Sequence, residues 1–199
     1  GLCEAEAISI NKSFIHRNKT GQSYGVLKWA MSLDGRIGLS NGNSKWISNE
    51  FSRSKVHSLR ADFDAIVIGG NTLRNDDPLL TTREIKNPEP LRVVFTKSLK
   101  LPINRKLWDC NAAKSLIVYD GSYADEKYLL KLPKCVETAR LESNDPKLLS
   151  KLLAERGLNK ILWECGPRLA TSALKNGCIQ EIITFIAPKI LGGINAMTP

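Results

Sequence analysis

The chain has 199 residues, of which 42% are hydrophobic and 25% are charged. This composition excludes a chain that is mainly disordered, and no run of 18 apolar residues is present that could span a membrane. The 29 Lys and Arg residues exceed the 20 Asp and Glu residues, which gives a formal net charge of +9. This excess is compatible with a polyanion partner, with several small phosphate sites, or with no specific role.

Short apolar runs rich in β-branched residues alternate with helical patterns along the chain. In chain order, the sequence predicts a strand over residues 25–39, bent near Asp34-Gly35, then a helix over 48–61 and three strands over 65–68, 92–95 and 115–119. Two helices over 123–132 and 145–157 follow. The last predicted elements are a strand over 160–163, a helix over 167–176 and a strand over 182–186. Ser48 is the expected N-cap of the first helix, and Asp145-Pro146 opens the third. The alternation predicts a single α/β domain with helices on the faces of a sheet.

The cysteines and histidines give little support for cross-links or metal sites. Five cysteines at wide spacing favour reduced intracellular thiols over a disulfide framework. There is no CxxC pair, and the only two histidines, His16 and His57, are far apart in the sequence. No metal site is therefore predicted.

Two junctions between a strand and a helix carry glycine. They lie at Gly69-Gly70 and at Gly166-Pro167, whereas neither GxGxxG nor the P-loop pattern is present. Glycine lets a ligand approach the backbone, and the amide groups of a first helical turn attract anions. Each junction is thus a candidate phosphate site, although glycine is also favoured in such turns for structural reasons alone.

Three charged positions interrupt the apolar pattern. Glu164 closes a buried strand, where a carboxylate needs either a salt bridge or a functional role. Lys28 is either an edge-strand lysine that faces water or a lysine that projects into a cleft. Asp76-Asp77-Pro78 is most typical of a turn, with a metal-ligand pair or a helix terminator as the alternatives.

A set of short motifs then follows one another in a fixed order. They occupy residues 27–37, 42–48, 59–61, 64–69, 76–83, 90–94, 163–167 and 187–192. Together they resemble the reductase domain of the bifunctional deaminase–reductases of riboflavin biosynthesis, over about residues 24–193. Trp-Glu-Cys-Gly-Pro at 163–167, where many relatives have Glu-Gly-Gly, is similar to the plant version.

The resemblance implies a fold and an activity. The expected fold is dihydrofolate-reductase-like, an α/β fold with a predominantly parallel central sheet and helices on both faces. The implied enzyme is an oxidoreductase, a 5-amino-6-(5-phosphoribosylamino)uracil reductase, in which NADPH gives a hydride to C1′ of the ribosyl group. The family also implies a homodimer, a soluble intracellular protein and, for a plant member, a location in the plastid stroma.

The family's functional residues are carried over onto matching positions. Lys28, Asp76 and Glu164 are the expected catalytic residues. NADPH contacts are expected at Ala30, Trp46, Thr72, Asp76, Lys97, Gly166, Pro167, Arg168, Leu169, Ala170, Thr171 and Ser172. Substrate contacts are expected at Lys28, Ser44, Ser48, Arg60, Leu80, Arg83 and Glu164. No metal is implied.

The positively charged residues Arg60, Arg83 and Lys97 of this set each have a physical rationale. Arg60 and Arg83 suit a sugar phosphate, because guanidinium groups pair with phosphate in a fork geometry. Lys97 stands where the family often has a small residue, so it either pairs with the 2′-phosphate of NADPH or crowds the adenosine. We favour the pairing.

The resemblance also suggests how the chain is organised. Residues 1–22 are similar to the connector that follows the deaminase domain of relatives, and residues 23–199 to the reductase domain. Relatives continue with a further strand, so a trimmed C-terminus and an open sheet edge are expected. Deamination is not expected, because the zinc motif of that activity is missing.

Three other interpretations remain at this point. The first is a catalytically inactive copy that acts as a scaffold or dimerisation module, against which the intact Lys28, Asp76, Arg83 and Glu164 argue. The second is a nucleic-acid-binding protein, but the positive charges are scattered and not interleaved with aromatic residues. The third is a true dihydrofolate reductase, from which the motifs around Lys28, Ser44 and Glu164 point away. We expect neither a nucleic-acid nor a membrane partner.

Overall fold

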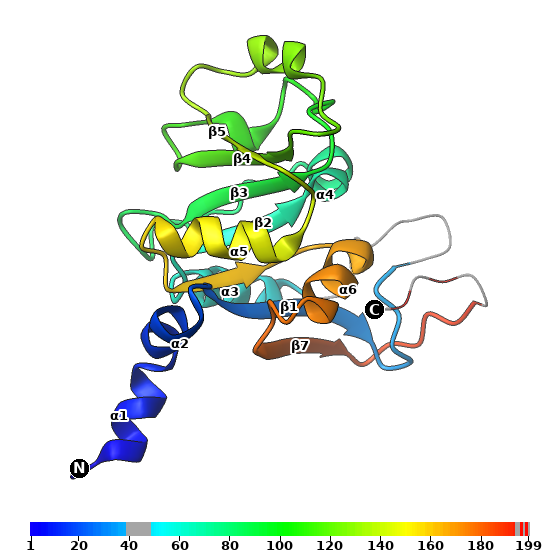
Figure 1. The fold of residues 1–199 in the computed structure, drawn as a ribbon. Coiled ribbons are helices and arrows are strands. Elements are labelled where there is room, and N and C mark those ends of the chain that lie inside the picture. Colours follow the sequence, from blue (N-terminus) through cyan, green and yellow to red (C-terminus); the bar gives the residue numbers. More distant parts are fainter. Residues whose placement is uncertain (39–48, 194–195, 197, 199) are drawn as a thin grey trace.

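Seven strands form one sheet in the order β5-β4-β3-β2-β6-β1-β7 (Figure 1). The computed structural model describes residues 1–38, 49–193, 196 and 198. The strands are β1 (Tyr24–Ser32), β2 (Ala65–Gly69), β3 (Leu91–Thr96), β4 (Ser115–Asp120), β5 (Glu137–Leu141), β6 (Lys160–Trp163) and β7 (Glu181–Ala187). Every neighbouring pair runs parallel, which confirms the predicted α/β class with its parallel central sheet.

Helices cover both faces of this sheet (Figure 1). They are α1 (Glu4–Ile10), α2 (Lys12–Thr20), α3 (Glu50–Arg60), α4 (Gly70–Asp76), α5 (Pro146–Glu155) and α6 (Pro167–Lys175), with 3-10 turns η1 (Lys106–Trp108) and η2 (Glu126–Lys131). On one face, Leu149 of α5 and Ala170 of α6 pack into a buried cluster with Trp163. On the other, Leu59 of α3 and Leu73 of α4 pack against a second cluster. The core therefore lies in two apolar layers, one on each side of the sheet.

Two of the helices begin at a side-chain cap. Asp145 accepts a hydrogen bond from the backbone N–H of Lys147 at 2.8 Å, with Pro146 at the first position of α5, as predicted. Helix α3 begins at Glu50, and its cap is Asn49, whose side chain accepts from the N–H of Ser52 at 2.9 Å. The predicted cap, Ser48, was therefore wrong by one position, and Ser48 itself lies outside the described residues.

Two predicted elements are shorter than expected. Strand β1 ends at Ser32, because the chain turns there and Gly35 adopts a left-handed φ of 72°. Asp34 stabilises this turn by accepting hydrogen bonds from the hydroxyl of Ser32 and from the N–H groups of Leu191 and Gly192. The helix predicted over 123–132 is reduced to the 3-10 turn η2.

The cysteine prediction was wrong for one pair. Cys110 and Cys135 form a disulfide with their Cα atoms 6.3 Å apart. Cys110 lies shortly before β4 and Cys135 shortly before β5, and these two strands are parallel neighbours. The segments that precede neighbouring parallel strands meet at one edge of the sheet, which the sequence spacing of the cysteines does not reveal. Cys3, Cys165 and Cys178 are free thiols.

Helix α1 extends away from the sheet, and α2 joins it to the start of β1 (Figure 1). Helix α2 is fastened by an ion pair between Lys12 and Glu181 of β7, and by a hydrogen bond of 3.2 Å from Arg17 to the carbonyl of Ala154. Leu2 and Ile10 of the preceding segment are almost fully exposed. The interpretation of residues 1–22 as a connector stays a prediction.

Substituting Gly25 with alanine is expected to lower the free energy of unfolding by about 3 kcal/mol. A Cβ atom at this position of β1 would overlap the carbonyl oxygen of Cys178 and lie 2.9 Å from Nε1 of Trp163. Gly69→Ala is the matched control in β2, because its Cβ would find only Cδ2 of Leu169 at 3.6 Å. Urea denaturation of both variants measures the difference, and equal midpoints would contradict the close packing at Gly25.

Candidate functional site

Several of the predicted site residues lie at or near the carboxyl edge of the sheet. In a parallel sheet the carboxyl ends of all strands meet at the same edge, where ligands of open α/β sheets bind. Gly70 follows β2, Lys97 follows β3 and Glu164 follows β6. Because β3, β2 and β6 are successive neighbours, these positions line one continuous rim.

Lys28 lies in an interior strand. Its strand β1 is paired with β6 on one side and β7 on the other, so the interpretation as an edge-strand lysine is wrong. Leu27 is in register with Trp163, which places Lys28 beside Glu164. Burial lowers the pKa of Lys28, the nearby Glu164 opposes this shift, and Arg60 reinforces it. Lys28 is therefore a cation whose proton is held less tightly than in water.

Glu164 forms a two-point ion pair with Arg60 of α3. Nε of Arg60 lies 2.7 Å from Oε1, and Nη2 lies 3.1 Å from Oε2. The two side chains are only 11% and 12% exposed. Burial disfavours the charged carboxylate, but Arg60 together with Lys28 and His57 outweighs this and lowers the pKa of Glu164. Glu164 is thus an ionised carboxylate held rigidly at the end of β6.

Arg60 also reaches the loop that follows α4. Its Nη1 donates to the carbonyl of Thr81 at 3.0 Å, and Nδ1 of His57 lies 3.1 Å from the same oxygen. These bonds use three of the five N–H groups of the guanidinium, counting partners within the described part of the chain. The remaining donors leave Arg60 able to bind an anion while it stays paired with Glu164.

The loop over residues 77–84 has an unusual backbone. Its non-glycine residues with positive φ are Asp77 (43°), Leu80 (58°), Arg83 (56°) and Glu84 (68°). Such outliers cost energy and cluster at binding sites. Glu89 holds the loop by accepting from the N–H of Thr82 at 2.7 Å and from its hydroxyl at 2.8 Å. The side chain of Leu80 is buried in the core, so a substrate contact there would involve its backbone.

The start of α6 offers an open backbone. Gly166 is the N-cap and Pro167 the first helical residue, as the sequence predicted. A Cβ at Gly166 would meet no atom within 4 Å, so a ligand can approach the amide groups of this turn. The expected cofactor contacts at 166–172 comprise the N-cap and the first six residues of the helix. Ala170 is fully buried, so a contact there would also be through the backbone.

The other predicted contacts are distributed around this rim. Ala30 lies two residues after Lys28 on the same face of β1, Thr72 lies in the first turn of α4, and Asp76 is the exposed last residue of that helix. Nζ of Lys97 lies 4.4 Å from the ring centroid of Tyr123. Ser44, Trp46 and Ser48 lie outside the described residues, so their expected roles stay predictions.

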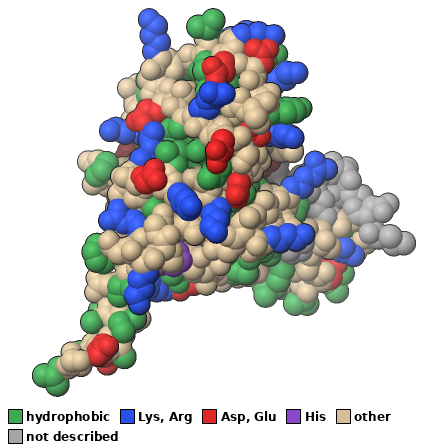
Figure 2. Space-filling model, in the orientation of Figure 1, with side chains coloured by type: hydrophobic (Ala, Val, Ile, Leu, Met, Phe, Trp, Pro, Cys, Tyr) green, Lys and Arg blue, Asp and Glu red, His purple; other side chains and the backbone are tan. Residues whose placement is uncertain are grey.

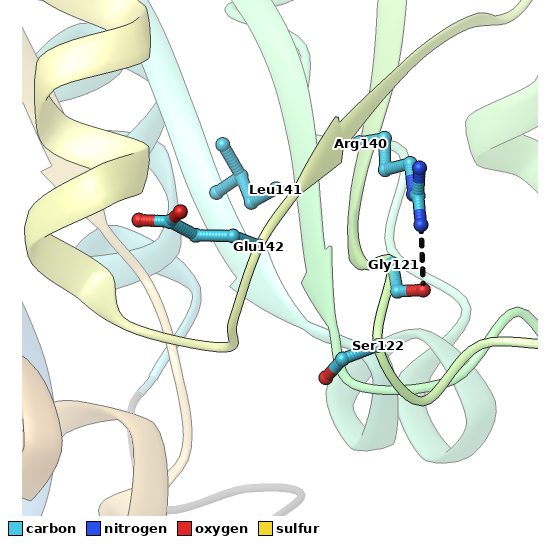
Figure 3. A pocket seen from close by; sticks show the side chains of 5 residues that line it. All are labelled: Gly121, Ser122, Arg140, Leu141 and Glu142. Carbon is cyan, nitrogen blue, oxygen red and sulfur yellow. Dashed lines mark hydrogen bonds between the residues drawn. The ribbon is translucent and has the colours of Figure 1, made fainter.

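A cavity of about 380 Å³ opens at the carboxyl ends of β4 and β5 (Figure 3). It is lined by Gly121, Ser122, Arg140, Leu141 and Glu142. Nη2 of Arg140 donates to the carbonyl of Gly121 at 3.1 Å, and a Cβ at Gly121 would overlap the Arg140 side chain. None of the predicted site residues lines this cavity, but β4 is the neighbour of β3, which ends beside Lys97.

The described ranges hold neither a metal-binding cluster nor a membrane-spanning helix. No group of three or more His, Cys, Asp or Glu side chains there could hold a metal ion. None of the helices described is both long enough and apolar enough to cross a membrane. Lys and Arg side chains are spread over the face shown in Figure 2 and interleaved with Asp and Glu.

The family model described as the RibD C-terminal domain matches residues 23–199. The chain belongs to this family. It is 40% identical over 200 residues to the riboflavin biosynthesis protein RibD of Synechocystis, covering all of this chain and 54% of that protein. It is also 40% identical over 190 residues to the chloroplastic riboflavin biosynthesis protein PYRR of Arabidopsis thaliana, covering 96% of this chain and 32% of that protein.

A solved structure is similar over nearly the whole chain. The deaminase and 5-amino-6-(5-phosphoribosylamino)uracil reductase of Thermotoga maritima superposes with a TM-score of 0.84 at 26% identity, over 98% of this chain and 52% of that one. The expected family and its dihydrofolate-reductase-like fold are therefore confirmed. The chain spans about half the length of its bacterial relatives and a third of the plant protein.

Part of the site was not found by sequence reasoning. Arg60 and the loop that it contacts are held by His57, the carbonyl of Thr81 and the carboxylate of Glu89, but no motif pointed to these groups. The pattern around α3 shows only a helix with a polar face, and a loop carbonyl has no signature in a sequence. The one available signal was that His57 lies three residues before Arg60, on the same side of a helix.

Proposed function

We propose that this domain reduces 5-amino-6-(5-phosphoribosylamino)uracil to its ribitylamino product with NADPH. The observation that carries the proposal is the cluster of Lys28, Glu164 and Arg60 beside the open start of α6. The reaction needs a proton donor, a carboxylate and a site for an anion beside the cofactor. Lys28, Glu164 and Arg60 supply these three groups next to the rim where a dinucleotide would bind. The family assignment supports the same chemistry.

Two features of the rim fit a dinucleotide. The amide groups at Gly166 would hold the pyrophosphate, because the start of a helix favours negative charge. Lys97 lies two strands away along the rim, at roughly 10 Å from strand spacing, which suits the adenosine end. When bound, NADPH supplies the hydride to C1′, and the protein supplies orientation and proton transfer.

Lys28 is the better proton donor of the two charged groups at the centre. Reduction of the open-chain imine adds a hydride to C1′ and a proton to the adjacent nitrogen, which gives a secondary amine. The lowered pKa of Glu164 keeps it ionised, whereas the lowered pKa of Lys28 brings its acidity toward the working pH. We assign the proton to Lys28 and the stabilisation of the cationic imine to Glu164.

The 5′-phosphate would bind at the loop side of the site. Arg60 keeps donors available beyond its ion pair, and Arg83 lies exposed in the loop that Arg60 contacts. Both guanidinium groups suit phosphate oxygens. This places phosphate recognition at the junction of α3 and the loop over residues 77–84.

Replacing Lys97 with glutamine is expected to weaken the preference for NADPH over NADH by about tenfold, the effect of losing one charge-assisted hydrogen bond. Lys97 stands beside Asp120 and Tyr123, next to the cavity at the ends of β4 and β5. Steady-state KM values for the two cofactors measure the change. An unchanged ratio would mean that Lys97 does not contact the 2′-phosphate.

Purified protein, NADPH and the pyrimidine substrate test the activity directly. The proposal expects NADPH oxidation that depends on the substrate. A folded protein without such oxidation, with a longer version of the chain behaving alike, would favour the inactive scaffold. Binding to mixed-sequence DNA that weakens with salt would instead revive a nucleic-acid partner.

The family also suggests an oligomeric state and a cellular location for the protein. We propose a homodimer, as the family resemblance implies. We also propose that the protein acts in the plastid stroma, because it is similar to PYRR proteins that are named chloroplastic in Arabidopsis thaliana and Zea mays.

A further inference from the structure

His57 of α3 lies between the ion pair of Arg60 with Glu164 and the loop with the unusual backbone. We propose that His57 is a positioning residue that fixes Arg60 and the loop over residues 80–83 as one substrate-binding unit. The proposal rests on the proposed function, because its effect is on binding of the phosphorylated pyrimidine.

The carbonyl of Thr81 joins the two side chains. It lies 3.0 Å from Nη1 of Arg60 and 3.1 Å from Nδ1 of His57. A carbonyl oxygen can only accept, so His57 must carry its proton on Nδ1 to make this bond. Nδ1 of His57 also lies 3.4 Å from Nη1 of Arg60, and both atoms then donate to the same carbonyl oxygen.

The shared acceptor connects two parts of the substrate site. Arg60 is held by Glu164 on one side and by Thr81 on the other, so its guanidinium has one orientation. Thr81 follows Leu80, a residue in the left-handed region, and precedes Thr82, which Glu89 holds from the far side. Without His57, the loop would lose one of the two contacts that join α3 to the carbonyl of Thr81.

The charges around His57 favour a neutral donor at this position. Arg60 on its own helix, Arg83 in the loop and Glu164 after β6 are the charged groups that act on it. Burial is the largest influence and lowers the pKa of His57, and the charges of both arginines lower it further. The bond to Thr81 and the charge of Glu164 act in the opposite direction. A neutral imidazole thus contacts the carbonyl without adding a third cation that would compete with Arg60 for Glu164.

Two substitutions separate positioning from general stability. In His57→Asn the side-chain amide places an N–H near the position of Nδ1–H, whereas His57→Ala removes the donor. We expect His57→Ala to raise KM for the pyrimidine about tenfold with kcat and KM for NADPH within about threefold, and His57→Asn to restore KM to within about threefold of the wild type. His16→Asn on α2, at the opposite end of β1, is the matched control and is expected to have wild-type constants.

A second measurement does not depend on activity. The chain has only two histidines, so nitrogen-15 NMR with the His57→Asn variant assigns both imidazoles. We expect the neutral Nδ1–H tautomer for His57, and an altered His57 signal in Arg60→Met. An Nε2–H tautomer, or a His57→Ala enzyme with the wild-type KM for the pyrimidine, would overturn the proposal. If the wild type shows no turnover, the proposed function fails, whereas the tautomer still decides the geometry at Thr81.

Discussion

Replacing Lys28 with methionine is expected to lower kcat by about 100-fold or more, the usual contribution of a general acid. The same change is expected to raise the free energy of unfolding by about 1 kcal/mol, because an apolar side chain replaces a charge that is costly to bury. Lys28 lies in the interior strand β1 beside Glu164, and burial lowers its pKa. Activity and stability therefore move in opposite directions, which a purely structural lysine would not produce.

The effect of Lys28 on the free energy of unfolding is expected to change with pH. The pKa of Lys28 is lowered from its ordinary value of 10.5, so the unfolded chain binds more protons at this position. The stability of the wild type should therefore rise toward that of Lys28→Met as the pH approaches 10.5. Lys151→Met on the exposed face of α5 is the control and should show neither effect. A Lys28→Met protein that is less stable but fully active would contradict the assigned role.

Replacing Glu164 with glutamine is expected to lower kcat/KM by about 100-fold, because the carboxylate that faces the cationic imine is lost. In contrast to Lys28→Met, it is also expected to lower the free energy of unfolding by about 3 kcal/mol, since the mostly buried Arg60 keeps its charge without a counter-ion. Steady-state kinetics and urea denaturation measure the two effects. Glu155→Gln, at an exposed position of α5, is the matched control.

The contribution of Glu164 to stability also depends on pH. Its pKa is lowered from the ordinary value of 4.5, so the stabilisation is complete above that value and is lost as the pH falls through the folded-state pKa. Wild type and Glu164→Gln should therefore converge in stability in acid. A difference that persists unchanged at low pH would show that the ion pair with Arg60 is not its source.

The buried strands were predictable because their sequences report their environment. Strands β2, β3, β4 and β6 are covered on both faces, so each appears as a continuous apolar run. Strand β5 was missed because it is an edge strand whose Glu137–Leu141 sequence is mostly exposed and carries no such run. The helices α1 and α2 were also missed, since they bury no residue that would impose a pattern.

The candidate site residues could be named one by one from the sequence, but their arrangement in space could not. From the sequence, Glu164 was expected to have either a salt bridge or a functional role. In the structure it forms a salt bridge with Arg60 at the position where the functional role is expected. The partner of Glu164, Arg60, lies 104 residues earlier, and no local pattern relates the two. The disulfide between Cys110 and Cys135 was unpredictable for the same reason, since only the sheet order brings their segments together.

The excess of positive charge now has a partial explanation. Lys28, Arg60, Arg83 and Lys97 lie around the carboxyl edge of the sheet, where a phosphorylated substrate and a dinucleotide would bind. On the face shown in Figure 2, the remaining Lys and Arg side chains are mixed with acidic ones. On the proposed function these four side chains account for part of the net charge of +9, and the rest of the excess has no assigned role.

The most direct test of the central claim follows the hydride itself. The wild-type chain is incubated with the phosphoribosylaminouracil and with NADPH that carries deuterium at C4 of the nicotinamide, each stereoisomer in turn. The account predicts that one of the two isomers delivers a single deuterium to C1′ of the ribityl product, with one NADPH consumed for each product formed. Bound cofactor and bound substrate without deuterium at C1′ would contradict it.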